Sequence, residues 1–263
     1  MRIVKKLFAL LLTLLLVPSL SANALKGDAV SIRVAAAADL TDAFKEIAAR
    51  YTQKSGCRVD LIFGASGQLT QQIEHGAPYD VFASASSSYI QELSLKHLTL
   101  PDTEKIYAIG KLVVWFPEGS KLSLKRIQDL NSAAIHHISI ANPQHAPYGK
   151  AALEAIRKSG LYSALQPKLV YGENVRQAFQ FAQTGNAEAC IVSASIVVGK
   201  GNSFLIPAVS YNPILQTIAA LKSTQHEREA RGFTQFLLSA DGRAILKKYS
   251  FSFPLDKKQK PAH

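Results

Sequence analysis

Short apolar segments alternate with amphipathic ones along this sequence, and the alternation limits the chain to one class of fold. Residues 31–36 form an apolar run of strand length, and apolar residues then recur at helical spacing over 40–51 until Gly56. The first pattern predicts a buried strand, and the second predicts an amphipathic helix that ends at a glycine. Because the same order continues through apolar runs at 59–63 and 80–83, the sequence predicts an α/β fold with a helix-covered, parallel sheet.

A second cycle of the same kind fills the middle of the chain. Strands are predicted at 111–116, 137–141, 168–171 and 190–192, and helices at 123–130, 149–159 and 175–182. After this cycle come a strand at 214–221, a helix over 230–237 and a further segment at 242–249. The alternation therefore predicts two α/β units of similar size, and it leaves open where the last strand and helices pack.

The first residues have the layout of a cleavable secretory signal. Three basic residues precede an apolar run at 7–17, and alanines stand three residues and one residue before a cut after Ala24. The apolar run is shorter than the ~20 residues that span a bilayer. No cysteine stands at the cut to carry a lipid, and no second long apolar segment follows. We therefore expect residues 1–24 to be removed on export and the mature chain to be soluble in the periplasm.

Size and charge allow several partners for the mature chain. Removal of 24 of the 263 residues leaves 239, enough for one large domain or two ordinary ones. The formal net charge of +11 falls to +8 because the signal carries three basic residues and no acidic ones. Such an excess suits nucleic acid, an anionic membrane or an anionic ligand. The basic residues are scattered, and their densest cluster is the tail 257–263, which we interpret as a solvated, flexible end. We expect no nucleic-acid partner.

The two cysteines, Cys57 and Cys190, lie in apolar surroundings and in different predicted units. We expect buried free thiols rather than a disulfide, although export makes a bridge chemically allowed. The chain has no C-x-x-C, and its adjacent histidines, His136 and His137, point in different directions in a strand or a helix. The sequence therefore predicts no metal-ligating site.

Four places follow one plan, in which an apolar strand leads through a turn of small residues into a helix start. They are residues 36–41, 64–67, 147–149 and 172–175. In open α/β sheets, ligands bind beyond the carboxyl ends of the strands. A helix start there offers unpaired N–H donors and a partial positive charge, which together bind an anion without lysine or arginine. Each turn alone is an ordinary loop, but two in each half of the chain predict an anion site in a cleft between two lobes.

Five segments carry a resemblance to a known family when they are taken together. They are VAAAADLTDA (34–43), FGASGQLTQQI (63–73), GAPYDVF (76–82), ANPQHAPYG (141–149) and ENVRQA (173–178). In this order they resemble the periplasmic molybdate-binding proteins of ABC transporters. The resemblance covers essentially the whole mature chain, and it is the ordered set that is specific, not any one segment.

The resemblance implies a two-lobed, class II periplasmic-binding-protein fold, with mixed, mostly parallel sheets and the ligand cleft between the lobes. The first lobe would comprise residues 25–108 and a return segment at 208–256, and the second lobe residues 109–207. The implied function is capture of molybdate, or of tungstate with the same charge and shape, for the permease of a membrane ABC transporter. We expect a monomer that is not an enzyme and has no cofactor, in which the only metal is the molybdenum of the bound oxyanion.

The resemblance also implies the anion-binding residues, which are Asp39, Ser66, Tyr148, Val175 and Ser193. Ser66 would donate its hydroxyl, and Tyr148 and Val175 their backbone N–H groups. Asp39 stands where many relatives have serine, and its carboxylate would repel a dianion. We therefore expect its N–H to face the ligand while its side chain caps the helix or turns away. Ser193 stands where many relatives have tyrosine, and it is shorter.

Other functions stay open at this level. A binding protein of this kind could take sulfate, phosphate or a metal chelate instead of molybdate. A secreted hydrolase belongs to a different class, but the chain has neither G-x-S-x-G nor H-E-x-x-H, and Ser66 stands in G-A-S-G. A ligand-sensing domain of a transcription regulator can share the fold. The signal peptide and the lack of a helix-turn-helix stretch before Ser31 argue against that alternative.

Overall fold

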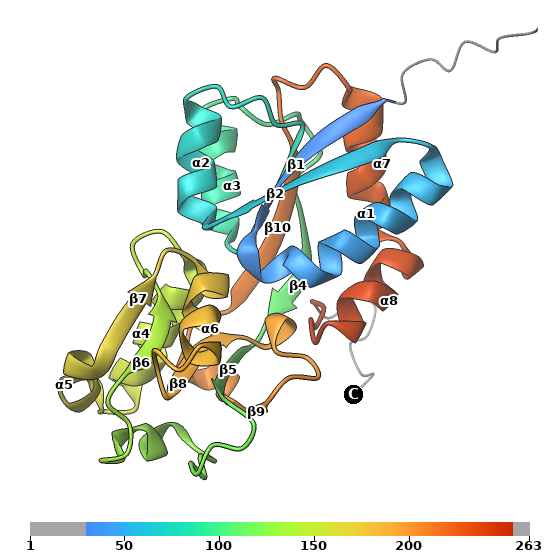
Figure 1. Ribbon diagram of the computed structural model, residues 1–263. Helices are drawn as coiled ribbons and strands as arrows, with labels where there is room; N and C mark the ends of the chain where they lie inside the picture. The colour runs from blue at the N-terminus through green and yellow to red at the C-terminus, as the bar shows by residue number, and fades with distance from the viewer. Residues whose placement is uncertain (1–29, 255–263) are drawn as a thin grey trace, which may run out of the picture.

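The computed structural model describes residues 30–254 as two lobes, each built on a five-stranded sheet (Figure 1). The predicted signal peptide, 1–24, and the predicted basic tail, 257–263, lie outside the described residues. In Figure 1 the blue, cyan and red segments belong to one lobe, and most of the green, yellow and orange segments belong to the other. Both ends of the described chain therefore contribute to the same lobe.

The first sheet has the strand order β2-β1-β3-β10-β4. Its strands are β1 (Ser31–Ala37), β2 (Arg58–Gly64), β3 (Val81–Ser84), β4 (Lys105–Gly110) and β10 (Ile214–Ala220). β1 runs parallel to β2 and β3, whereas β10 is antiparallel to both of its neighbours, β3 and β4. The late strand whose place the sequence left open thus inserts into the first sheet.

The second sheet has the order β7-β6-β8-β5-β9. Its strands are β5 (Leu112–Phe116), β6 (Ile138–Ala141), β7 (Leu169–Gly172), β8 (Ala189–Ser193) and β9 (Asn202–Leu205). β6 is parallel to β7 and β8, and β5 is antiparallel to β8 and β9. Parallel and antiparallel pairs are therefore equally frequent in both sheets, where the sequence predicted mostly parallel pairing. All the antiparallel pairs involve β5 or β10, and each of these is the first strand after the chain passes from one sheet to the other. Parallel pairing of consecutive strands requires a crossover connection within the same sheet, and neither strand is preceded by one.

Helices pack on both sheets (Figure 1). The first lobe has α1 (Thr41–Ser55), α2 (Ser66–Glu74), α3 (Ser87–Leu95), α7 (Glu227–Leu238) and α8 (Ala240–Lys248), and the second has α4 (Pro147–Lys158), α5 (Tyr162–Leu165) and α6 (Val175–Gln183). As predicted, α1 ends at Gly56, whose φ of 74° lies in the left-handed region. α4 begins two residues before the predicted start, because Pro147 suits the first helical position.

Several observed elements differ from those that the apolar pattern predicted. β4, β9, α3 and α5 were not predicted, and the predicted helix at 123–130 is a 3₁₀ helix at Ile127–Asn131. Only Leu130 is buried in that segment, which offers too little apolar surface to hold a longer helix. α3 had a visible start signal in its serine run, because the Ser86 side chain accepts the N–H of Ser88 as a helix cap.

The C-terminal helices pack against the first helix through aromatic rings. Phe233 of α7 lies edge-on to two rings of α1, with centroids 6.0 Å from Phe44 and 5.4 Å from Tyr51. Such edge-to-face contacts add to the burial of the rings. The Tyr51 hydroxyl also donates to the carbonyl of Glu229, at 2.9 Å. The return segment is thus part of the core of the first lobe.

The predicted state of the cysteines is confirmed. Cys57 lies in the first lobe and Cys190 in β8 of the second, and both are buried, free thiols. Burial raises the pKa of the Cys190 thiol well above its usual value. Neither thiol is therefore a reactive group near neutral pH.

Gly149, in the first turn of α4, lies so close to the end of β6 that it leaves no room for a side chain. A Cβ at this position would lie 2.0 Å from the carbonyl oxygen of Ala141 at the end of β6. The glycine therefore allows α4 to begin directly against the strand that precedes it.

We expect Gly149→Ala to lower the free energy of unfolding by about 3 kcal/mol, the upper part of the range for overpacked sites. The clash with the backbone of Ala141 should outweigh the ~1 kcal/mol by which alanine favours a helix interior. Urea unfolding measures the change. Gly64→Ala is the control, because its Cβ would meet only the side chain of Leu69, at 3.2 Å. Equal stability of Gly149→Ala and the native protein would contradict this account of the packing.

Candidate functional site

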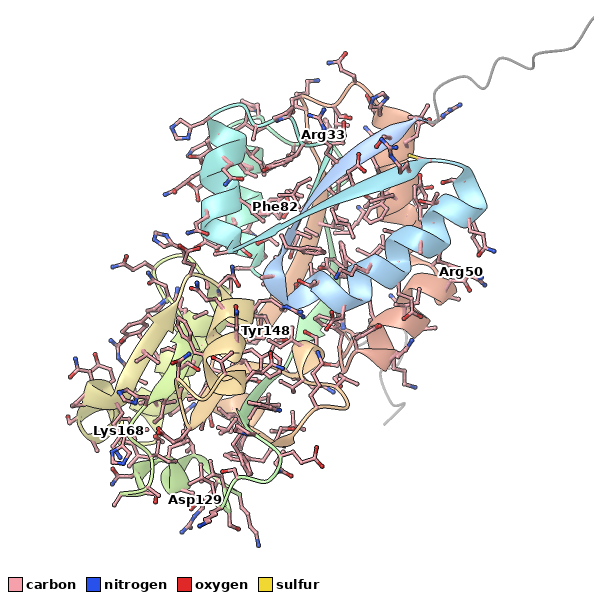
Figure 2. The ribbon with its side chains drawn as sticks, viewed as in Figure 1. Arg33, Arg50, Phe82, Asp129, Tyr148 and Lys168 are labelled. Atoms are coloured by element: carbon pink, nitrogen blue, oxygen red, sulfur yellow. The ribbon has the colours of Figure 1, made fainter. Side chains whose placement is uncertain are left out.

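The four predicted helix starts meet around one cavity where the lobes face each other. Each follows the carboxyl end of a strand: β1 leads into a short 3₁₀ helix (Ala38–Leu40), and β2, β6 and β7 lead into α2, α4 and α6. The cavity is lined by small or neutral side chains from these starts and by one residue after β3, Ala85. The residues of the starts are Ala37, Ala38, Asp39, Gly64, Ala65, Ser66, Ala146, Pro147, Tyr148, Asn174 and Val175. Figure 2 places Tyr148 at the boundary between the two lobes.

The size and charge of the cavity restrict what it can hold. Its volume is about 10 Å³, room for about one water-sized sphere and far below the roughly 300 Å³ or more of pockets for drug-sized ligands. Among its lining residues there is no lysine, arginine or histidine, and Asp39 is the one acidic residue. A ligand here is therefore small and meets mostly backbone donors.

Backbone N–H groups at the helix starts supply those donors. Ser66 and Val175 are the first residues of α2 and α6, and Tyr148 follows Pro147, which has no N–H, at the start of α4. Helix geometry gives the first N–H groups no partner within the helix. Within residues 30–254, none of these three N–H groups donates to a protein acceptor. They are consequently available to a ligand.

Other N–H groups in the first turns of α2 and α6 already donate to protein acceptors. The Asn174 side chain caps α6 by accepting the N–H groups of Arg176, at 3.0 Å, and Gln177, at 3.2 Å. The N–H of Gly67 donates to the carbonyl of His145 in the other lobe, at 2.9 Å. The N–H groups of Gly67, Arg176 and Gln177 are therefore not available to a ligand, whereas those of Ser66 and Val175 are.

Ser66 has a hydroxyl proton to offer. Its side chain is 1% exposed, and its Oγ accepts the N–H of Ala85 at 3.1 Å. A hydroxyl has one proton and two lone pairs, so accepting this bond leaves the proton free to be donated. The Ser66 hydroxyl is therefore available to donate to a ligand.

Asp39 does not cap a helix, and this part of the prediction is wrong. Neither the 3₁₀ helix nor α1 has a side-chain cap, because the 3₁₀ turn places Leu40, not Asp39, at the N-cap position of α1. The carboxyl turns toward the protein interior instead. Its Oδ2 accepts Nε2 of Gln216 at 2.8 Å, and it interacts with the hydroxyl of Tyr148.

Burial raises the pKa of Asp39 to about 7. Desolvation is the largest cause, and hydrogen bonds from Tyr148, from the backbone N–H of Asp39 and from Gln216 oppose it only in part. The pKa values of Tyr148 and Tyr107 are raised well above the usual value, first by burial and then by the nearby Asp39. The region behind the cavity therefore disfavours negative charge.

Ser193 is not among the residues that line the cavity. Its hydroxyl lies 2.7 Å from that of Ser195, which donates to the carbonyl of Asp39, also at 2.7 Å. Four of the five predicted site residues thus line the cavity together. Ser193 does not line it and is linked to Asp39 through Ser195.

The sequence reading missed Gln216, Tyr107 and Ser195. Gln216 is fully buried in β10 and joins Asp39 to the two tyrosines. A signal was present, because Gln216 and Thr217 are polar residues inside a strand whose other residues, over 214–220, are apolar. Buried polar groups of this kind require partners, which only the tertiary structure identifies.

Ion pairs also join the lobes beside the cavity. Asp42 of α1 contacts Arg176 of α6 at 3.1 Å and Lys200, in the loop before β9, at 3.3 Å. Together with the bonds from Gly67 to His145 and from Ser195 to Asp39, these contacts hold the lobes against each other around the cavity.

No group of three or more histidine, cysteine, aspartate or glutamate side chains in residues 30–254 is arranged to hold a metal ion. No helix of this part of the chain is long and apolar enough to cross a membrane.

Known proteins resemble this chain along most of its length. Residues 32–252 match the family described as bacterial extracellular solute-binding proteins. A molybdate-binding protein ModA of Rhodobacter capsulatus is 38% identical over 240 residues, which cover 90% of this chain and 93% of the relative. ModA of Azotobacter vinelandii is 34% identical over 228 residues, which cover 85% and 90%.

A solved structure agrees with the same assignment. The periplasmic molybdate-binding protein of Azotobacter vinelandii superposes with a TM-score of 0.81 and 30% identity, over 85% of this chain and 99% of that one. The predicted two-lobed, class II periplasmic-binding-protein fold is thereby confirmed. The chain belongs to the family of bacterial extracellular solute-binding proteins.

Proposed function

We propose that this chain captures molybdate, or tungstate, in the periplasm and delivers it to the permease of an ABC importer. The observation that carries the proposal is the small cavity between the lobes, lined by four helix starts and by no basic side chain. Three free N–H groups and the Ser66 hydroxyl are donors suited to a tetrahedral oxyanion. The relatives named for molybdate support the choice among oxyanions.

The proposed roles follow from the arrangement around the cavity. Ser66 contributes from the first lobe, and Tyr148 and Val175 contribute N–H groups from the second. Asp39 contributes its N–H, which it shares between the anion and its own carboxyl. Ser193 positions Ser195 and the Tyr148 hydroxyl instead of touching the anion. Discrimination against sulfate would come from cavity size, because both anions accept the same hydrogen bonds. The chain acts as a monomer that binds without catalysis, and the permease recognises it with the lobes closed.

We expect molybdate and tungstate to raise the melting temperature of the mature protein much more than sulfate, phosphate or chromate. A ligand at ~100 times its dissociation constant stabilises the native state by about 2.7 kcal/mol. A thermal-shift series with the five anions at one ionic strength measures this. Equal shifts with sulfate and molybdate would contradict the proposed selectivity, and no shift with any anion would contradict oxyanion binding.

We expect Ser66→Ala to weaken molybdate binding and to destabilise the free protein. Loss of a hydrogen bond to a charged partner costs ~1.5–3 kcal/mol of binding free energy. The N–H of Ala85 also loses its acceptor, which lowers the free energy of unfolding by ~1–3 kcal/mol. Calorimetric titration and urea unfolding measure the two effects separately.

Ser86→Ala is the matched control for this variant. Ser86 caps α3 and does not line the anion cavity, so its loss should lower stability by ~1 kcal/mol and leave the affinity unchanged. Native affinity in Ser66→Ala would show that its hydroxyl serves only the turn.

A further inference from the structure

A cluster of buried polar side chains adjoins the anion cavity, and the proposed function gives these side chains no role in binding the anion. The cluster comprises Asp39, Tyr107, Tyr148 and Gln216, each at most 2% exposed. Nε2 of Gln216 donates to Asp39 at 2.8 Å and to the Tyr148 hydroxyl at 3.3 Å, and its Oε1 accepts the Tyr107 hydroxyl at 3.3 Å. The Asp39 carboxyl is the one group of the cluster that ionises readily.

The surroundings of this carboxyl are complete only when the lobes meet. Asp39, Tyr107 and Gln216 belong to the first lobe, whereas Tyr148 and Ser195 come from the second. Tyr148 bonds the carboxyl, and Ser195 bonds the carbonyl of the same residue. Separation of the lobes would therefore remove a hydrogen-bond donor and part of the cover from Asp39.

Gly110, in the first lobe, lies very close to Tyr148 of the second lobe. It is the last residue of β4, where the chain leaves the first sheet, and a Cβ there would lie 2.1 Å from the Tyr148 hydroxyl. The absence of a side chain allows this hydroxyl to reach the cluster. The contact between Gly110 and Tyr148 therefore lies where the chain passes from the first lobe to the second.

No positive charge compensates Asp39. The groups that face it are Tyr148 from α4, Tyr107 from β4, Gln216 from β10 and Ser195 after β8, all of them neutral near pH 7. The charged side chains that meet across the boundary, Asp42 with Arg176 and Lys200, pair with one another. An anion in the adjoining cavity would add a negative charge, which also favours the neutral carboxyl.

We propose that closure of the lobes on the oxyanion transfers one proton from solvent to the carboxylate of Asp39, so that capture is coupled to proton uptake. This inference rests on the proposed function. The proton ends on a carboxyl oxygen, the net negative charge of the closed site falls by one, and release of the anion returns the proton to solvent.

The direction of the pH dependence follows from the two states of Asp39. With the lobes apart, the carboxyl has water and an ordinary pKa near 4, whereas in the structure burial raises the pKa to about 7. The closed form is therefore favoured at low pH, and this advantage is lost as the pH rises through the closed-state pKa. These values correspond to affinity about tenfold higher at pH 6 than at pH 8.

Calorimetric titration of the full mature protein with molybdate tests the coupling. Titrations in buffers of different ionisation enthalpy count the protons taken up per anion bound. We expect about 0.9 proton at pH 6 and about 0.1 at pH 8. Binding with no proton uptake at either pH would overturn the inference and leave the proposed function intact. Absence of binding by molybdate and by tungstate at both values would overturn the proposed function itself.

Variants identify the titrating group. Asp39→Asn keeps the shape of the side chain and removes the titration, so both the proton uptake and the tenfold change in affinity should disappear. Asp241→Asn makes the same chemical change at an exposed ion pair with Lys54, away from the lobe boundary. His145→Gln removes the histidine that borders the lobe boundary. Both controls should keep the native pH profile. Persistence of proton uptake in Asp39→Asn, or its loss in His145→Gln, would overturn the assignment.

Discussion

Unpaired N–H groups at helix starts are the feature on which the rest of this structure depends. A buried dianion without a cation beside it needs fixed donors, and helix starts provide them without the desolvation of a charged side chain. In each lobe the parallel strands end at the same edge, so the helices that follow them begin close together. Two sheets facing each other then direct four helix starts at one cavity.

The small residues of the sequence make this convergence possible. Alanine and glycine precede the helix starts after β1 and β2, and Gly149 permits α4 to begin against the end of β6. Larger side chains at these turns would fill the cavity or separate the helix from its strand. The same small residues that look ordinary in the sequence therefore set the size of the site, on which the proposed selection among oxyanions depends.

Asp39 is the exception in a site otherwise built from neutral groups. An unpaired buried carboxylate is costly, and the structure offers it neutral donors from both lobes instead of a cation. The natural response of such a group is to take up a proton. A residue that seems to oppose anion binding thus becomes compatible with it, and the compensation depends on Tyr148, which arrives from the other lobe.

The sequence by itself determined the α/β class, the helix starts, the buried free cysteines and four residues of the cavity, because periodicity, turn residues and ordered motifs are local. It did not place β10 between β3 and β4, predict β9, or assign the Asp39 side chain. β9 has little apolar pattern because it is a short, exposed edge strand. The partners of Asp39 lie 109 and 177 residues away, at Tyr148 and Gln216. Local propensity suggested a cap for this carboxyl, and only the meeting of the two lobes decided that it is buried in a hydrogen-bonded cluster instead.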